Sequence, residues 1–165
     1  MSSPAKFFLA QIVTFINLSL GILSIISSDM KSAVLFILAA ALADRMDGKI
    51  ARKLNCESNF GRELDSLSDL VSFGVAPAVV VWRLSLNFAG FWGYIPIMLF
   101  VTAGAFRLAR FNLSKSSESF LGMPITIAGS LVAFITFFTS NNIFLSILLI
   151  ILSFLMISSI KFKKI

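Results

Sequence analysis

Four aspartates lie in two close pairs between two hydrophobic segments, although the chain has only eight acidic residues among 165. They are Asp44, Asp47, Asp65 and Asp69. A charged side chain at mid-membrane costs roughly 2.5–3.5 kcal/mol on insertion scales, so four carboxylates together need a cation or a function that offsets this cost. The group therefore predicts a metal site in a membrane protein.

The spacing of the aspartates predicts two facing pairs. Residues three or four apart share a helix face, so Asp44 and Asp47 project together from the end of one helix, and Asp65 and Asp69 from the start of the next. The chain has no histidine and one cysteine, which leaves an oxygen-only cage. Such a cage favours Mg²⁺ or Mn²⁺, with Ca²⁺ also compatible, and Mg²⁺ is usually held by a few carboxylates plus substrate phosphates.

Small and cationic residues accompany the aspartates. Gly48, Ala51 and Gly61 leave room for a bulky group between the two helices, and Arg52 offers a forked donor to a phosphate. Each feature alone has an ordinary explanation: a solvated helix end, helix packing or a membrane-surface anchor. Their combination between two hydrophobic segments favours a phosphate-binding site.

The composition places the chain in a membrane. Hydrophobic residues make up 58% of it, with 18 Phe, which exceeds what a soluble domain buries. The lack of His and the single Cys exclude Ser-His and Cys-His catalysis, Cys/His zinc sites and internal disulfides. The net charge of +6 comes without a basic stripe, so nucleic-acid binding is not indicated.

We predict an all-α fold: one membrane domain, residues 1–165, built as a bundle of six transmembrane helices. The expected spans lie near residues 7–27, 31–53, 61–86, 90–112, 121–141 and 143–160. Twelve of the fourteen Lys and Arg fall on one side of such a bundle, with only Lys31 and Arg83 on the other. Because Lys and Arg accumulate in cytoplasmic loops, both termini and the aspartates are expected at the cytoplasmic face of the cell membrane.

The string from Asp44 to Asp69 resembles, position by position, the signature of the CDP-alcohol phosphatidyltransferases. It reads Asp44-x-x-Asp47-Gly48-x-x-Ala51-Arg52, then eight residues, then Gly61-x-x-x-Asp65-x-x-x-Asp69. The resemblance implies a membrane-embedded six-helix enzyme in which an alcohol attacks the lipid-side phosphate of a CDP-lipid and CMP leaves.

The resemblance also implies roles for these residues. Asp44, Asp47 and Asp65 would bind a pair of divalent ions, to which Asp69 contributes while it takes the proton from the attacking hydroxyl. The residues expected around the CDP-lipid are Gly48, Arg52, Ser58 and Gly61.

Three stretches, residues 61–77, 106–112 and 120–124, resemble the serine-using branch of this family. Leu70 follows Asp69, where the branch that uses glycerol phosphate has Ala-Asp-Lys. The resemblance therefore implies phosphatidyl transfer from CDP-diacylglycerol to L-serine. Because serine carries a carboxylate, Arg107 and Arg110 are candidates to bind it; the alternative is that they anchor a helix end at the membrane surface.

Other interpretations stay open at this point. The alcohol could be glycerol phosphate, inositol phosphate or choline. A cation transporter would favour inverted repeats and helices broken at mid-membrane, and neither is visible in the sequence. An inactive structural subunit would not need four aspartates. The expected partners are the two substrates and membrane lipid, and whether the chain forms a homodimer is left open.

Overall fold

The structure is a computed structural model that describes residues 4–54, 58–113 and 120–162, with side chains described for residues 11–46, 58–113 and 122–160. Its elements are α1 (Pro4–Ile26), α2 (Met30–Leu54), α3 (Asn59–Asp69), η1 (Leu70–Val75), α4 (Ala76–Leu84), η2 (Leu86–Gly93), α5 (Tyr94–Leu113), β1 (Phe120–Leu121), α6 (Ile125–Phe138), α7 (Asn142–Ile157) and β2 (Lys161–Phe162).

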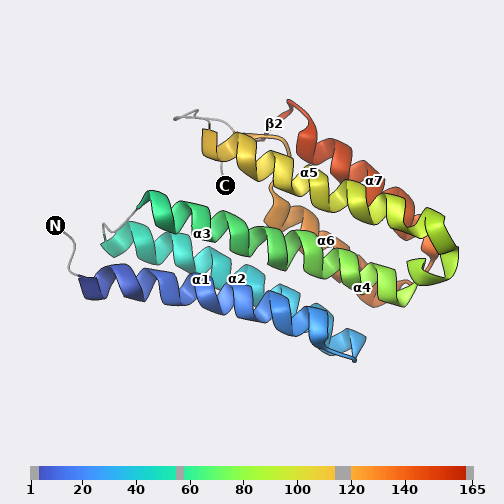
Figure 1. The fold of residues 1–165 in the computed structure, drawn as a ribbon, viewed down its shortest axis with the longest axis horizontal. Coiled ribbons are helices and arrows are strands. Elements are labelled where there is room, and N and C mark those ends of the chain that lie inside the picture. The colour runs from blue at the N-terminus through green and yellow to red at the C-terminus, as the bar shows by residue number, and fades with distance from the viewer. Residues whose placement is uncertain (1–3, 55–57, 114–119, 163–165) are drawn as a thin grey trace.

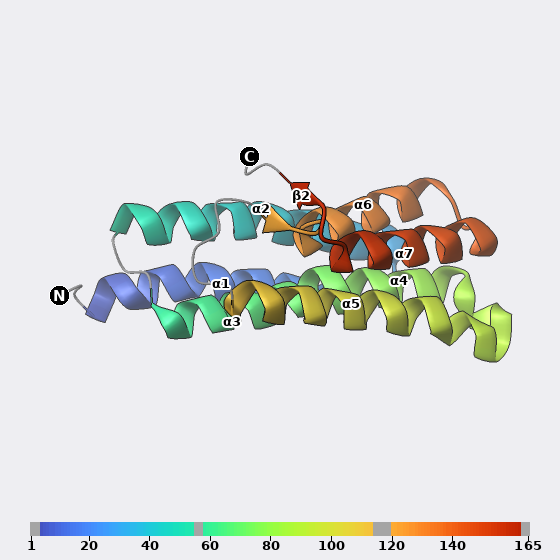
Figure 2. The same ribbon diagram turned by 90° about the horizontal axis from the view of Figure 1, so that it is seen from above.

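The helices form two layers of parallel and antiparallel rods. Since α3, η1 and α4 are continuous and η2 leads into α5, the described residues make six rods. One layer holds α1, the α3–α4 rod and α5, and the other holds α2, α6 and α7 (Figures 1 and 2). Each of these rods overlaps one of the predicted segments, and the prediction of a helical fold is confirmed.

Local sequence explains where the rods begin. Ser58 caps α3 by accepting a hydrogen bond from the Gly61 N–H at 3.0 Å, and Asn141 caps α7 through the Phe144 N–H at 3.1 Å. Asp29 accepts bonds from the N–H and the hydroxyl of Ser32 at the start of α2. The Ser32 N–H is the main cause of an Asp29 pKa below its usual value.

The segment before α6 departs from the sequence prediction. A helix was expected from residue 121, but Phe120–Leu121 pairs antiparallel with Lys161–Phe162, and α6 begins at Ile125. Gly122 has a positive φ of 79°, and Pro124 precedes the first helical residue. Both residues disfavour an earlier helix start. This strand pair is the one departure from an all-α fold in the part of the chain that the structure describes.

The α3–α4 rod changes helix type immediately after Asp69. Residues Leu70–Val75 form a π-helical stretch, and Pro77, which lacks an N–H, follows in the first turn of α4. Gly129 of α6 lies against this stretch so closely that a Cβ on it would come within 2.3 Å of the Phe73 carbonyl oxygen. The contact brings α6 directly onto the rod that carries Asp65 and Asp69.

The polarity of α1 is typical of a helix in lipid. Its buried side is formed by polar or small residues, and its exposed side by large apolar ones such as Phe15, Ile16 and Ile22. The buried positions are Gln11, Thr14, Asn17, Gly21 and Ser24. A soluble helix would bury its apolar face instead, so α1 indicates membrane association.

Two helices of the described chain are long and apolar enough to cross a membrane: Asn59–Leu84 and Leu86–Leu113, each with an 18-residue stretch of mean hydropathy 1.5. Shorter apolar helices cover Gln11–Ile26, Ile125–Phe138 and Asn142–Ile157. Large apolar side chains such as Phe88, Leu113 and Phe154 are at least 70% exposed. Such a surface is suited to lipid rather than to water.

Candidate active site

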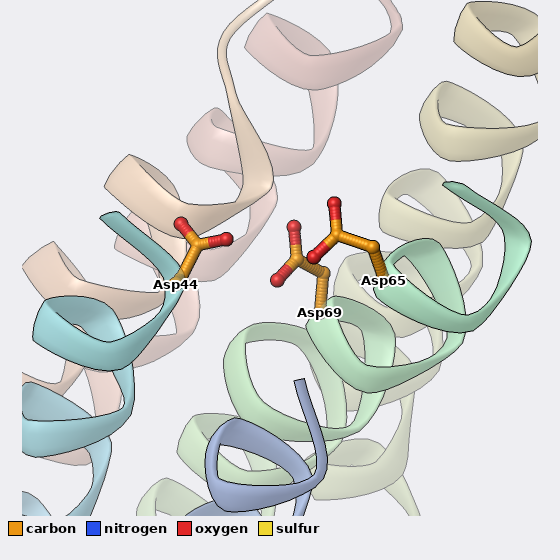
Figure 3. Close-up of side chains that lie close together, drawn as sticks. All are labelled: Asp44, Asp65 and Asp69. Carbon is orange, nitrogen blue, oxygen red and sulfur yellow. The ribbon is translucent and has the colours of Figure 1, made fainter. Parts of the chain in front are cut away.

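Three of the four predicted carboxylates converge between α2 and α3. Each of Asp44, Asp65 and Asp69 offers an oxygen within 4.8 Å of the oxygens of the other two. Figure 3 shows Asp44 reaching from α2 toward Asp65 and Asp69 on α3. Asp44 and Asp65 are half-buried, whereas Asp69 is only 7% exposed. Two unit charges 4.8 Å apart repel by about 3.5 kcal/mol at an effective dielectric constant of about 20, so a cation at this position would stabilise the group.

Three other predicted residues, Asp47, Gly48 and Arg52, lie on α2 in a stretch whose side chains fall outside the described residues. Their metal and CDP-lipid roles stay predictions. Ser58 and Gly61 form the capping turn of α3, where a Cβ on Gly61 would lie 3.1 Å from the Ser58 hydroxyl oxygen. The predicted contact of these two residues with the CDP-lipid would therefore be made at the start of the helix that carries Asp65 and Asp69.

Asn17 on α1 is a site residue that the sequence analysis missed. Its Nδ2 donates a hydrogen bond to Asp69 Oδ1 at 3.2 Å, and the Asn17 side chain is fully buried. The Ser72 hydroxyl donates to the Asn17 backbone carbonyl at 3.0 Å, which fastens α1 to the stretch after Asp69. The available signal was the row of polar residues at helical spacing in an otherwise apolar segment.

Gly21 permits this close approach of α1. A Cβ at this position would lie 2.4 Å from the Ser72 hydroxyl oxygen and 2.8 Å from the Ser72 Cα. Any larger residue must push α1 away from the rod that carries Asp69.

The Gly21→Ala substitution is therefore expected to reduce activity at least tenfold, because a displacement of about 1 Å can cost a hundredfold in a positioned site. It should also lower the free energy of unfolding by about 1–3 kcal/mol, as overpacking does. Turnover and thermal unfolding in detergent measure the two effects. The control is Ser19→Ala on the exposed side of α1; equal behaviour of the two variants would show that the close packing is unimportant.

Arg107 and Arg110, predicted as a pair, have different surroundings. Arg107 is 7% exposed and close enough to Asp69 to interact electrostatically, and its Nε has no hydrogen-bond partner among the described residues. Arg110 instead donates to the carbonyls of Ile157 at 3.0 Å and Ser158 at 3.2 Å, at the C-terminal end of α7. Arg107 thus lies beside the carboxylate cluster, whereas Arg110 satisfies carbonyls that α7 leaves without helical partners.

A second polar contact holds α3 against α5 beside the carboxylates. Asn112 Nδ2 lies 3.1 Å from both Glu63 Oε2 and Ser66 Oγ. Ser66 follows Asp65 directly, so this contact fixes the helix turn that carries Asp65. Asp69, one turn farther along α3, is held by Asn17 of α1.

The donor atoms suit a hard divalent cation. Carboxylate oxygens from three aspartates can hold Mg²⁺, Mn²⁺ or Ca²⁺, whereas zinc and copper sites usually contain His or Cys. The residues present therefore fit a divalent metal.

The fold and site together define an apolar helical bundle suited to a membrane, with a cluster of carboxylates suited to a divalent ion between two of its helices. The family model for CDP-alcohol phosphatidyltransferase matches residues 7–159, and the chain belongs to this family. The family membership favours the transferase over the cation transporter and the structural subunit.

Named relatives cover most of the chain. It is 43% identical over 144 residues to a CDP-diacylglycerol–serine O-phosphatidyltransferase of Bacillus subtilis, covering 87% of this chain and 81% of that protein. A protein of the same name from Methanocaldococcus jannaschii is 37% identical, with 94% and 74% covered. The archaetidylserine synthase of Methanothermobacter thermautotrophicus is 36% identical, with 95% and 70% covered.

Proposed function

We propose that this protein transfers the phosphatidyl group of CDP-diacylglycerol to the hydroxyl of L-serine and releases CMP. Membership of the CDP-alcohol phosphatidyltransferase family supports the reaction type, and the serine-headed names of its relatives support the alcohol. The observation that carries the proposal is the convergence of Asp44, Asp65 and the buried Asp69 beside Arg107.

Asp69 is proposed as the general base. It would accept the proton of the serine hydroxyl while the hydroxyl oxygen forms a bond to the lipid-side phosphorus. The bond between that phosphorus and the oxygen of CMP breaks, and CMP leaves with the bonding electron pair. Asn17 supports this role because its bond to Oδ1 limits the rotation of the Asp69 carboxylate.

Asp44, Asp47, Asp65 and Asp69 would hold the divalent metal. When bound, the metal would neutralise pyrophosphate charge and stabilise the leaving CMP. Gly48, Arg52, Ser58 and Gly61 are proposed around the CDP-lipid. Their common position, at the end of α2 and the start of α3, supports this assignment.

Arg107 is proposed to bind the serine carboxylate. Burial strengthens a charge-assisted hydrogen bond, and the Nε that lacks a partner in the described structure is a donor suited to a carboxylate oxygen. Arg110 is the weaker candidate for this role because two main-chain carbonyls of the α7 end already occupy its guanidinium.

We further propose six membrane crossings, with both termini and the carboxylates at the cytoplasmic side. The six rods and the distribution of Lys and Arg support this orientation. Serine and other charged metabolites would then reach the site from the cytoplasm, while the diacylglycerol part of the donor stays in the bilayer.

The head group is tested by a competition among alcohols. Purified protein with CDP-diacylglycerol and Mn²⁺ should release CMP at least ten times faster with serine than with glycerol phosphate, inositol phosphate or choline at equal concentration. The expected difference follows from the charge-assisted bond between the serine carboxylate and Arg107, which choline cannot make and which a larger phosphate group would have to make in the place of a carboxylate. Faster release with one of the other alcohols would contradict the serine assignment and leave the family membership intact.

A further inference from the structure

Asn17 contains a buried acceptor that the proposed mechanism does not use. Its side-chain amide is planar, and only the NH₂ group can donate to the Asp69 carboxylate. The carbonyl Oδ1 of the same amide is then left without a hydrogen-bond partner anywhere in the described structure, although the residue is fully buried. Buried carbonyl oxygens without a partner are rare and unfavourable, so this atom indicates a donor on a bound ligand.

The position of Asn17 limits which donor this is. Asn17 contacts Asp69 directly, and the Ser72 hydroxyl and the close packing of Gly21 hold its part of α1 in place. A ligand that donates to Oδ1 must therefore carry its donor next to the group that Asp69 deprotonates. In serine, the carbon that bears the ammonium is bonded to the carbon that bears the hydroxyl.

We propose that Asn17 determines specificity for an amino alcohol: its Oδ1 accepts an N–H from the ammonium of serine while its Nδ2 holds Asp69. The inference rests on the proposed function. Three buried side chains from three helices then match the three functional groups of serine. Asp69 on α3 meets the hydroxyl, Asn17 on α1 the ammonium, and Arg107 on α5 the carboxylate.

The test compares serine with 3-hydroxypropionate, which is serine without its amino group. For each protein, kcat/KM is measured with both alcohols at saturating CDP-diacylglycerol and Mn²⁺. Asn17→Leu keeps the approximate shape of the side chain but removes both polar atoms. It should reduce the ratio of kcat/KM for serine to kcat/KM for 3-hydroxypropionate about ten- to hundredfold, the effect of one charge-assisted hydrogen bond. The KM for serine should rise, whereas the KM for CDP-diacylglycerol should stay within about twofold.

The ratio separates recognition from a general disturbance of the site. A change that only misplaces Asp69 slows both alcohols alike and leaves the ratio unchanged, which would overturn the proposal. A raised Mn²⁺ requirement with an unchanged ratio would assign Asn17 Oδ1 to the metal and would also overturn it. Asn17→Ala provides a second variant with the same expected ratio if the leucine variant does not fold.

Ser24→Ala is the matched control. Ser24 lies on the same side of α1, is fully buried, and has a hydroxyl without a partner among the described residues, but it is two turns farther along the helix. Its ratio should equal that of the wild type. If the wild-type protein does not use serine, both the proposed function and the role of Asn17 fail; an unchanged ratio in a serine-using enzyme rejects the role of Asn17 alone.

Discussion

The Asp69→Asn variant is expected to lose about 10²- to 10⁴-fold in kcat, the usual contribution of a positioned general base. The substitution keeps the shape of the side chain but removes its ability to accept a proton. Binding of CDP-diacylglycerol should be weakened much less, because Asp44 and Asp65 remain in the cluster. Single-turnover kinetics with labelled serine, together with equilibrium binding of the CDP-lipid, measure the two effects separately.

Glu63→Gln is the matched control for this variant. Glu63 lies on the same helix but is exposed, and the substituted amide oxygen can still accept the hydrogen bond from Asn112. Its kcat should stay within about twofold of the wild type, as for a surface substitution. Near-normal turnover of Asp69→Asn would remove Asp69 from the role of base.

Removal of divalent metal is expected to abolish activity completely. With excess EDTA, the carboxylates of Asp44, Asp65 and Asp69 would have no cation through which to hold a pyrophosphate. Addition of Mg²⁺ or Mn²⁺ beyond the chelator should restore turnover, and a comparison with Ca²⁺ identifies which ion supports the reaction. Full activity in excess chelator would contradict the metal site.

Metal binding should also be visible without turnover. A ligand at a hundred times its Kd stabilises the folded protein by about 2.7 kcal/mol, so Mn²⁺ should raise the melting temperature of the wild-type protein in detergent by several degrees. Asp65→Asn should show a smaller rise, since it removes one of the three clustered carboxylates. The Glu63→Gln variant should respond as the wild type does.

The sequence was sufficient to predict the helices and the convergence of Asp44, Asp65 and Asp69. Hydrophobic length located the rods to within a few residues, and the later start of α6 is explained by Gly122 and Pro124, which delay the helix. The spacing of four between Asp65 and Asp69 places them on one face whatever the tertiary structure is. Helical periodicity was therefore sufficient to predict that Asp65 and Asp69 lie together.

Tertiary packing decided what the sequence left open. Arg107 and Arg110 are three residues apart on one helix, yet one lies beside Asp69 and the other contacts the end of α7. Three residues correspond to a rotation of about 300°, close to a full turn, so the two side chains point in similar directions. The helices packed around them therefore decide what each side chain contacts. Asn17 was missed for the same reason, because it lies 52 residues from the aspartate that it contacts.

The most direct test of the proposed function is identification of the products from purified protein, CDP-diacylglycerol, Mn²⁺ and labelled serine. The proposal predicts one CMP released for each labelled serine that appears in a phosphatidylserine, and formation of both products at least a hundredfold more slowly, on the order of the general-base contribution, with Asp69→Asn. CMP release without a serine-headed lipid, or formation of that lipid at equal rates by wild type and Asp69→Asn, would contradict it.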